Sequence, residues 1–245
     1  MNKNWKYLTV FVTGAILCLS LVWVANILAG ALVNVKHKGV VEVKGFATKQ
    51  ISSNLGIFEV RILSSNADLK LAYEKLAADK KALTDFLKRN GAKENVLQWS
   101  PVCVNEKNLI SDSGHTLNQV YEYEVSLGVK FQSENVGLIQ SLSSTVGELL
   151  NEGVRLTIYN PSFLYTDLEE LKIEMIGLAT ENAKKRAHTI SKKGNFKLGS
   201  ISQVRVGVFQ ITPLNSTDVS DYGVNDTTTI QKEIKCVVDI DYFVR

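Results

Sequence analysis

Apolar and polar residues alternate along much of the chain, and the period of this alternation predicts strands and helices. The clearest strand signal lies at 120–131, where Tyr121 and Val125 share one side while Glu122 and Glu124 share the other. One buried face and one wet face favour an antiparallel sheet. Related patterns predict further strands at 40–46, 56–63, 96–104, 154–160, 200–211 and 229–244.

Other segments repeat apolar residues at the spacing of a helix with one buried face. These segments are 68–90, 133–151 and 166–193. Gly91, Gly153 and Gly194 follow them and predict left-handed helix ends. Thr166 and Glu169 form a capping-box pattern at the start of the third helix, while Ser133 is the expected cap of the second.

Two polar segments, 105–119 and 212–228, are predicted to be loops. The strands gather in pairs near the two ends of the predicted order, with the helices between them. The expected fold class is therefore α+β, with largely antiparallel sheets and helices packed on one face, preceded by one N-terminal transmembrane helix.

The transmembrane helix is expected because the chain begins with a long apolar segment. No charged residue occurs between Lys6 and Lys36, and about 20 apolar residues suffice to cross the hydrocarbon core. The basic Lys3 and Lys6 favour a cytoplasmic N-terminus and export of the rest. The predicted organisation is a cytoplasmic N-terminus at 1–7, a transmembrane signal-anchor at 8–33, a stem at 34–38 and one exported domain at 39–245.

A cleaved secretory signal is the alternative interpretation of the same segment. Ala29-Gly30-Ala31 resembles a signal-peptidase site, and the lysines supply a basic start. The apolar core of a signal is about 7–15 residues long, however, and this one is longer. Its length favours an anchor that is retained.

The composition of the chain is that of an ordinary globular protein. It has 245 residues, of which 45% are apolar and 22% charged. The formal net charge is +3, and basic and acidic residues nearly balance after the apolar segment. We therefore expect no nucleic-acid partner and no electrostatic steering by the exported part.

The histidines are the first candidates for acid–base chemistry. His37 falls in the stem, His115 in a polar loop and His188 on a helix among basic neighbours, without a carboxylate at an informative spacing. The short motifs of nucleotide, serine-hydrolase and zinc-protease sites are not found. We assign no catalytic residue and no cofactor, and we expect a protein that is not an enzyme.

The three cysteines leave two interpretations open. Cys18 lies in the apolar segment and is expected to act as an apolar side chain. Cys236 is in phase with the apolar residues of its strand, which predicts a core position. Cys103 and Cys236 are either two separate buried thiols or, in an oxidising compartment and on neighbouring strands, a disulfide.

Oxygen-bearing side chains crowd the second polar loop. They are Asp218, Asp221, Asn225 and Asp226, with Gly223 between them. Carboxylates and amides are ligands of hard cations, which makes a metal site one interpretation. The spacing matches no EF-hand, and turn residues that bond their own backbone are the other interpretation. The metal, if one binds, is not identified by the sequence.

Two surfaces are candidates for association between copies. Ala179, Ala183 and Ala187 form a stripe of small residues, which is typical of close packing within a fold or at a subunit interface. The long strand at 120–131 is the other, because an exposed strand edge readily adds a strand from a neighbour. These features predict a homo-oligomer.

Several segments resemble the SIMPL-domain family of exported bacterial proteins. One is Val41-Glu-Val-Lys-Gly45-Phe-Ala47, followed by a strand and by a helix ending at Asn90-Gly91. The others are Tyr121-Glu-Tyr123-Glu-Val125, the helix with spaced alanines that leads into Gly194-Asn-Phe-Lys-Leu198-Gly199, and 218–227, which is similar to a longer-loop subgroup. The likeness covers about 39–245.

This resemblance implies an exported α+β protein that faces the periplasm, with links to envelope and oxidative-stress physiology. It supplies no catalytic residues. Many members resemble cleaved periplasmic proteins, from which the long apolar segment departs. We therefore expect a single-pass protein of the bacterial inner membrane, anchored through 8–33, whose C-terminal domain acts in the periplasm by binding or self-assembly.

Two other functions stay open at this point. One is a soluble periplasmic protein, released by signal cleavage, with a metal-dependent or ligand-binding site at the 218–226 loop. The other is a redox-responsive protein that uses Cys103 and Cys236.

Overall fold

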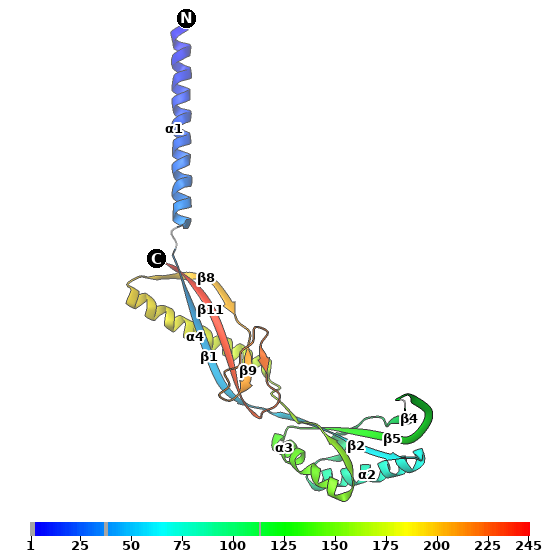
Figure 1. Ribbon diagram of the computed structural model, residues 1–245. Coiled ribbons are helices and arrows are strands. Elements are labelled where there is room, and N and C mark those ends of the chain that lie inside the picture. The colour runs from blue at the N-terminus through cyan, green and yellow to red at the C-terminus, as the bar shows by residue number, and fades with distance from the viewer. Residues whose placement is uncertain (1–2, 37–38, 113) are drawn as a thin grey trace. The chain divides into compact units, whose positions relative to one another are not determined.

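The computed structural model describes residues 3–36, 39–112 and 114–245. Helix α1 (Lys3–Lys36) comes first (Figure 1), and its segment Phe11–Ala29 is long and apolar enough to cross a membrane. Among the residues of this segment whose burial is described, none is buried against the rest of the chain. The structure thus confirms an N-terminal apolar helix of membrane-spanning length.

After α1 the chain forms two compact units, and the α+β fold class with largely antiparallel sheets is confirmed. The terminal unit consists of Met1–Ala47, Ile176–Gly207 and Val237–Arg245. The central unit consists of Thr48–Met175 and Val208–Cys236. Three elements contribute residues to both units: β1 (Val40–Ser52), α4 (Leu168–Gly194) and β11 (Gln231–Val244).

In the terminal unit, β11 lies between β1 and β8 (Leu198–Val206). Helix α4 packs on β1 so closely that only glycine fits at position 45. A Cβ atom there would lie 2.1 Å from the carbonyl oxygen of Ala179 and 2.5 Å from the amide nitrogen of Ala183. The alanine stripe is completely buried at this contact, which confirms its role in packing within the fold.

The central unit is built on a sheet in which every pairing is antiparallel (Figure 1). Strand β5 (Thr116–Ser133) pairs with β2 (Leu55–Asn66) on one side and with β3 (Leu97–Trp99) and β4 (Cys103–Ile110) on the other. Strands β6 (Arg155–Ile158) and β7 (Ser162–Leu164) continue the sheet beyond β2.

Helices α2 (Leu69–Arg89) and α3 (Val136–Thr145) cover one face of this sheet. The alternating residues of β2 and β5 point at these helices and form the core with them, as the period-2 pattern predicts. The 3-10 segments Glu94–Val96 and Val146–Glu152 follow α2 and α3. The first part of β11 pairs with β9 (Gln210–Pro213), which pairs in parallel with β10 (Val224–Asn225).

The segments 96–104 and 105–119 differ from the prediction of one strand followed by a loop. The structure instead has β3, then β4, then a turn into β5, whose first residues pair with β4. Ladder hydrogen bonds come from the backbone, so polar side chains do not prevent pairing. Lys107 stabilises it further, because its Nζ lies 3.1 Å from a carboxylate oxygen of Glu122 and 3.0 Å from one of Glu124.

The strand predicted at 200–211 is broken into β8 and β9. The break comes at Gly207, whose amide donates to the carbonyl oxygen of Val237 at 2.9 Å. Both β8 and β9 pair with β11. Strand β11 is therefore continuous where the neighbouring segment is interrupted.

The predicted left-handed helix ends are confirmed at two of the three glycines. Gly91 and Gly153 take left-handed conformations, with φ of 97° and 79°. After α4, however, Asn195 takes that conformation in place of Gly194, with φ of 56°. Asparagine is the other residue that tolerates it, since its short side chain bonds locally.

Helix starts were predicted less well. Asn135 caps α3 in place of Ser133, because its Oδ1 accepts from the amide of Leu138 at 3.1 Å. The fourth helix begins at Leu168, and the hydroxyl of Thr166 accepts from Nδ2 of Asn54 at 2.9 Å. Thr166 is therefore engaged by the connection between β1 and β2.

Candidate functional site

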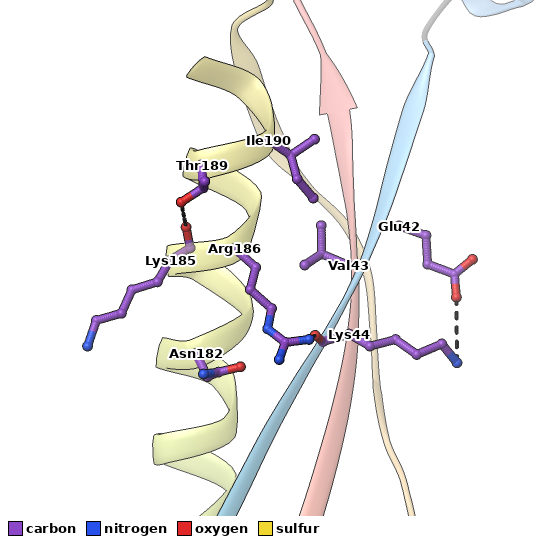
Figure 2. Close-up of a pocket in the computed structure, with 8 residues that line it drawn as sticks. All are labelled: Glu42, Val43, Lys44, Asn182, Lys185, Arg186, Thr189 and Ile190. Atoms are coloured by element: carbon purple, nitrogen blue, oxygen red, sulfur yellow. Dashed lines mark hydrogen bonds and ion pairs between the residues drawn. The ribbon is translucent and has the colours of Figure 1, made fainter. Parts of the chain in front are cut away.

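A shallow groove of about 430 Å³ lies in the terminal unit between β1 and α4 (Figure 2). Its lining mixes charged and apolar side chains: Glu42, Val43, Lys44, Asn182, Lys185, Arg186, Thr189 and Ile190.

Two α4 side chains bond the outer edge of β1. Nη1 of Arg186 donates to the carbonyl oxygen of Lys44 at 3.0 Å, and its guanidinium carbon lies 4.7 Å from the centroid of the Phe46 ring. Oδ1 of Asn182 accepts from the amide of Phe46 at 3.3 Å. Because Lys44 and Phe46 are two residues apart, both bonds occupy the side of β1 that β11 does not pair. The two side chains therefore close a strand edge.

The remaining charges of the groove are paired. Nζ of Lys44 lies 3.4 Å from a carboxylate oxygen of Asp239. Nζ of Lys185 lies 2.9 Å from Glu181, and this hydrogen bond lowers the pKa of that carboxyl. The groove thus holds α4 on β1 and offers no pair of nucleophile and base within its lining.

The 212–228 loop owes its order to a buried lysine. Nζ of Lys232 on β11 donates to the carbonyl oxygen of Phe163 at 2.8 Å and also to the carbonyl oxygen of Asp226. It lies 3.6 Å from the carboxylate of Asp226, and both side chains are almost fully buried. Lys232 thus connects the loop to the core of the central unit.

Asp226 is engaged on all sides. Burial alone would raise its pKa, but hydrogen bonds from Thr229 and Thr228 and the charge of Lys232 outweigh this and bring the pKa to about 2. Burial in turn lowers the pKa of Lys232, against the opposing effect of Asp226. Asp226 is therefore a structural carboxylate.

The other loop residues do not gather around a shared point. Oδ2 of Asp218 accepts from the hydroxyl of Ser216 at 2.8 Å, a local turn contact. An adjacent hollow of about 360 Å³ is lined by Asn225 but by neither Asp221 nor Asp226. In the described part of the chain, no three His, Cys, Asp or Glu side chains are grouped so that they could hold a metal ion.

The cysteines are free and lie in different environments. Cys236 is completely buried, as its phase predicts, and burial raises the pKa of its thiol. Cys103 is exposed on β4, so the prediction of two buried thiols is wrong for this one. Its strand lies at the edge of the sheet, outside the cover of the helices. The two cysteines are on strands of different sheets, and the structure has no disulfide between them.

The two histidines in the described part of the chain belong to no group that could hold a metal ion. His188 and His115 are exposed, on α4 and on the turn between β4 and β5. His37 lies outside the described residues. His188 is thus the solvated helix-face residue that its basic neighbours indicate.

The most unusual surface of the central unit is the hairpin of β4 and β5. We call β4 together with Thr116–Glu122 of β5 the arm. Residues 123–133 of β5 also pair with β2, so among the described strands only the outer part of the arm, Lys107–Ile110 with Thr116–Glu122, is a two-stranded ribbon. Large apolar side chains are exposed on it, among them Ile110 (69%), Val104 (49%) and Tyr121 (49%).

The arm also changes which edge is open. On one side, residues 120–131 of β5 have β4 and β3 as neighbours. On the other side, they pair with β2 from Tyr123 on. Most of the predicted association strand is therefore interior to the sheet. Strand β4 pairs only with β5 among the described strands, and its outer edge is free.

Sequence reasoning missed both the arm and the buried lysine. Lys232 is in phase with the buried Ile234 and Cys236, a signal that was available. The arm gave no such signal, because its residues are polar or apolar without a consistent period.

Comparison with known proteins gives a family but no activity. The family model described as "SIMPL: Protein of unknown function (DUF541)" matches residues 41–240. No match was found among curated proteins. One similar solved structure is the crystal structure of an amidase (hydantoinase/carbamoylase family) from Burkholderia phymatum, with 15% identity and a TM-score of 0.29.

That likeness covers 53% of this chain and 34% of the amidase chain, and at this TM-score it bears on neither fold nor function. The family match, by contrast, covers nearly all of the chain after α1 and agrees with the α+β fold described above. This chain belongs to the SIMPL family.

Proposed function

We propose that this SIMPL protein is anchored in the bacterial inner membrane by α1, and that it acts in the periplasm without catalysis by associating with further copies of itself through the arm. The single observation that supports this most strongly is the free edge of β4, which ends in a two-stranded ribbon with exposed apolar side chains. An envelope or oxidative-stress role stays a prediction from the family resemblance.

The anchor is supported by the exposure of α1. The segment Phe11–Ala29 makes no buried contact with the rest of the chain, and so many apolar side chains need an apolar environment. The hydrocarbon core supplies one, and the helical backbone satisfies its own hydrogen bonds there.

The arm is short of stabilising contacts as a single copy. A two-stranded hairpin in water is marginally stable, and a third strand or a packed face is what normally supports it. Here the side chains of Ile110, Leu117 and Tyr121 are exposed, and they lie beyond Tyr123, the outermost residue of β5 that pairs with β2. A strand added by a second copy would cover part of this surface.

The edge of β4 has few of the features that block strand addition. The positive charge of Lys107 is balanced by the carboxylates of Glu122 and Glu124. Their hydrogen bonds raise the pKa of Lys107, so it stays charged. Glu106 is the other charged residue of β4. The register shifts near Asn108 confine the regular edge to Cys103–Lys107. A short, nearly neutral edge suits a symmetric contact between two copies, which uses the same strand twice.

A non-catalytic role agrees with the contacts of the charged side chains. In the groove, Arg186 and Lys185 bond to backbone and to Glu181, and in the loop Asp226 bonds to Lys232 and two threonines. These groups stabilise the fold. The SIMPL family is not a known enzyme family.

The alternative, a metal or ligand site at the 218–226 loop of a cleaved protein, has less support. Asp226 faces the core, Asp218 bonds within its own turn, and neither lines the adjacent hollow. The intact mass of the protein extracted from membranes decides between anchor and cleaved signal, since the full chain has a mass of 27.1 kDa.

Native mass spectrometry of the full chain in a mild detergent tests association through the arm. We expect oligomers for the wild type and monomers for the variant Ile110→Glu/Leu117→Glu, because two buried carboxylates at the contact would each need desolvation. The matched control is Val219→Glu/Tyr222→Glu, which changes two exposed apolar residues of the 212–228 loop. A monomeric wild type, or arm and control variants that behave alike, would refute the proposal.

A further inference from the structure

The near balance of charge after α1 conceals a division between the two units. From residue 36 on, the terminal unit holds 11 Lys and Arg against 4 Asp and Glu, whereas the central unit holds 15 against 21. The net charge of the whole chain is therefore no guide to the partners of either unit. A strongly basic unit favours an anionic partner.

The basic side chains of the terminal unit fall into two groups. Some are paired with its few carboxylates, as Lys44 is with Asp239, Lys185 with Glu181 and Arg205 with Asp241. Others are exposed and form no ion pair with any described residue. We call the exposed and unpaired side chains near the end of α4 and the end of β11 the basic rim: Lys192, Lys193, Lys197 and Arg245.

The basic rim lies beside the point at which β1 begins. The amide of Val244 donates to the carbonyl oxygen of Gly39 at 2.8 Å. The next residue, Arg245, exchanges backbone hydrogen bonds with Lys197 at 2.8 and 3.3 Å. Lys197 in turn follows the end of α4, which carries Lys192 and Lys193 in its last turn. Hydrogen-bonded backbone thus holds the rim next to Gly39.

Gly39 is also close to the end of α1 along the chain. Gly39 follows Lys36, the last residue of α1, by three positions, and a chain of that length spans at most about 11 Å. This limit holds for every orientation of α1. The rim and the end of the apolar helix therefore stay close in any arrangement of the chain.

We propose that the basic rim binds the anionic phospholipid headgroups of the bilayer that α1 enters, which holds the terminal unit against the membrane surface. This rests on the proposed function, because it requires α1 to be in the bilayer. Each Lys or Arg at an anionic surface strengthens binding roughly fivefold. The attraction extends over about 8 Å at physiological ionic strength, close to the reach of the connecting residues.

Bilayer headgroups are favoured over the acidic central unit of a second copy, which also has the required charge. The membrane is covalently tethered to the rim through α1, so its effective concentration is high at every protein concentration. A second copy would have to be recruited from solution or from elsewhere in the membrane.

Lys192 and Lys193 also have a structural role, since cations in the last turn offset the negative end of a helix dipole. The test variant therefore changes the two rim residues outside the helix, Lys197→Glu/Arg245→Glu. The matched control is Lys81→Glu/Lys93→Glu, which reverses two exposed lysines of the central unit that form no ion pair with a described residue. Equal unfolding temperatures would show that each variant is folded.

Hydrogen–deuterium exchange of the full chain in lipid nanodiscs tests the proposal. Discs of phosphatidylcholine alone are compared with discs that contain about one third phosphatidylglycerol, a content that gives an anionic surface. We expect amide exchange at 192–198 and 240–245 to slow at least about threefold in the anionic discs. This is the effect expected if one or more rim side chains contact anionic headgroups. High salt and Lys197→Glu/Arg245→Glu should abolish the slowing, while Lys81→Glu/Lys93→Glu should preserve it.

The same data separate failure of this inference from failure of the anchor. Slow exchange in α1 combined with equal exchange of the rim in both discs would overturn the inference alone. Fast exchange throughout α1 would overturn the anchor and, with it, this inference. Protection of the rim that rises with the number of copies per disc would assign the rim to a second copy and overturn lipid binding.

Discussion

Position 45 shows how one missing side chain sets the contact between α4 and β1. A methyl group at Gly45 would overlap backbone atoms of Ala179 and Ala183, which cannot move without shifting the helix. We expect Gly45→Ala to lower the free energy of unfolding by about 1–3 kcal/mol or more. Thermal unfolding of the detergent-solubilised full chain, followed by circular dichroism, measures the change.

Gly177, which lies on α4, is the matched control for Gly45. No atom lies within 4 Å of a Cβ placed at Gly177, so an added methyl group meets open space. Gly177→Ala should raise stability by about 0.5–1 kcal/mol, because alanine loses less backbone entropy in a helix. Equal effects of the two substitutions would contradict the packing described here.

Lys232 and Asp226 form a second contact whose effect can be measured at the residue scale. Lys232→Met leaves a buried carboxylate without its cation, which costs about 3–5 kcal/mol. The double variant Lys232→Met/Asp226→Asn should recover part of this loss, because no unpaired charge remains. Urea unfolding at neutral pH tests it, and a single variant as stable as wild type would contradict the burial of the pair.

Asp226 also predicts a dependence on acid. Its pKa falls from 3.8 to about 2 in the folded state, so its contribution to stability is present above about pH 4 and is lost as the pH falls toward 2. The variant Asp226→Asn removes that carboxyl. It should lose less stability than wild type between pH 5 and pH 3 in urea unfolding. Parallel losses would show that another carboxyl is responsible.

At the scale of elements, strongly periodic segments were predictable and irregular ones were not. Helix α2 and its end at Gly91 follow from local signals, and β5 follows from strict alternation. Strand β4 depends on pairing with β5, a contact that no local pattern encodes. The break at Gly207 depends in the same way on β11.

The candidate sites divide along the same line. The burial of Cys236 and of the alanine stripe could be predicted, because both lie in phase with their elements. The bond of Arg186 to the edge of β1 could not, because the two residues are 142 positions apart. The contact of Lys232 with Asp226 depends on how the 212–228 loop folds onto β11, which no local pattern encodes. The acidic loop looked like a ligand set only while its partners were unknown.

At the scale of the whole molecule, a chain that is nearly neutral after α1 is made of a basic unit and an acidic unit. Residues from three separated segments build the basic unit, so no run of like charge marks it in the sequence. In our proposals, the anchor and the basic rim form one membrane-facing surface, and the arm forms one surface for association.

Thiol footprinting of Cys103 tests the central claim, association through β4, most directly. Cys103 is exposed on β4, whereas Cys236 is buried and reports unfolding. In the full chain with Cys18→Ser, we expect Cys103 to react quickly with a maleimide at low protein concentration and slowly once oligomers form. The variant Ile110→Glu/Leu117→Glu should react quickly at every concentration. Oligomers in which Cys103 reacts as fast as in the monomer would contradict association through this edge.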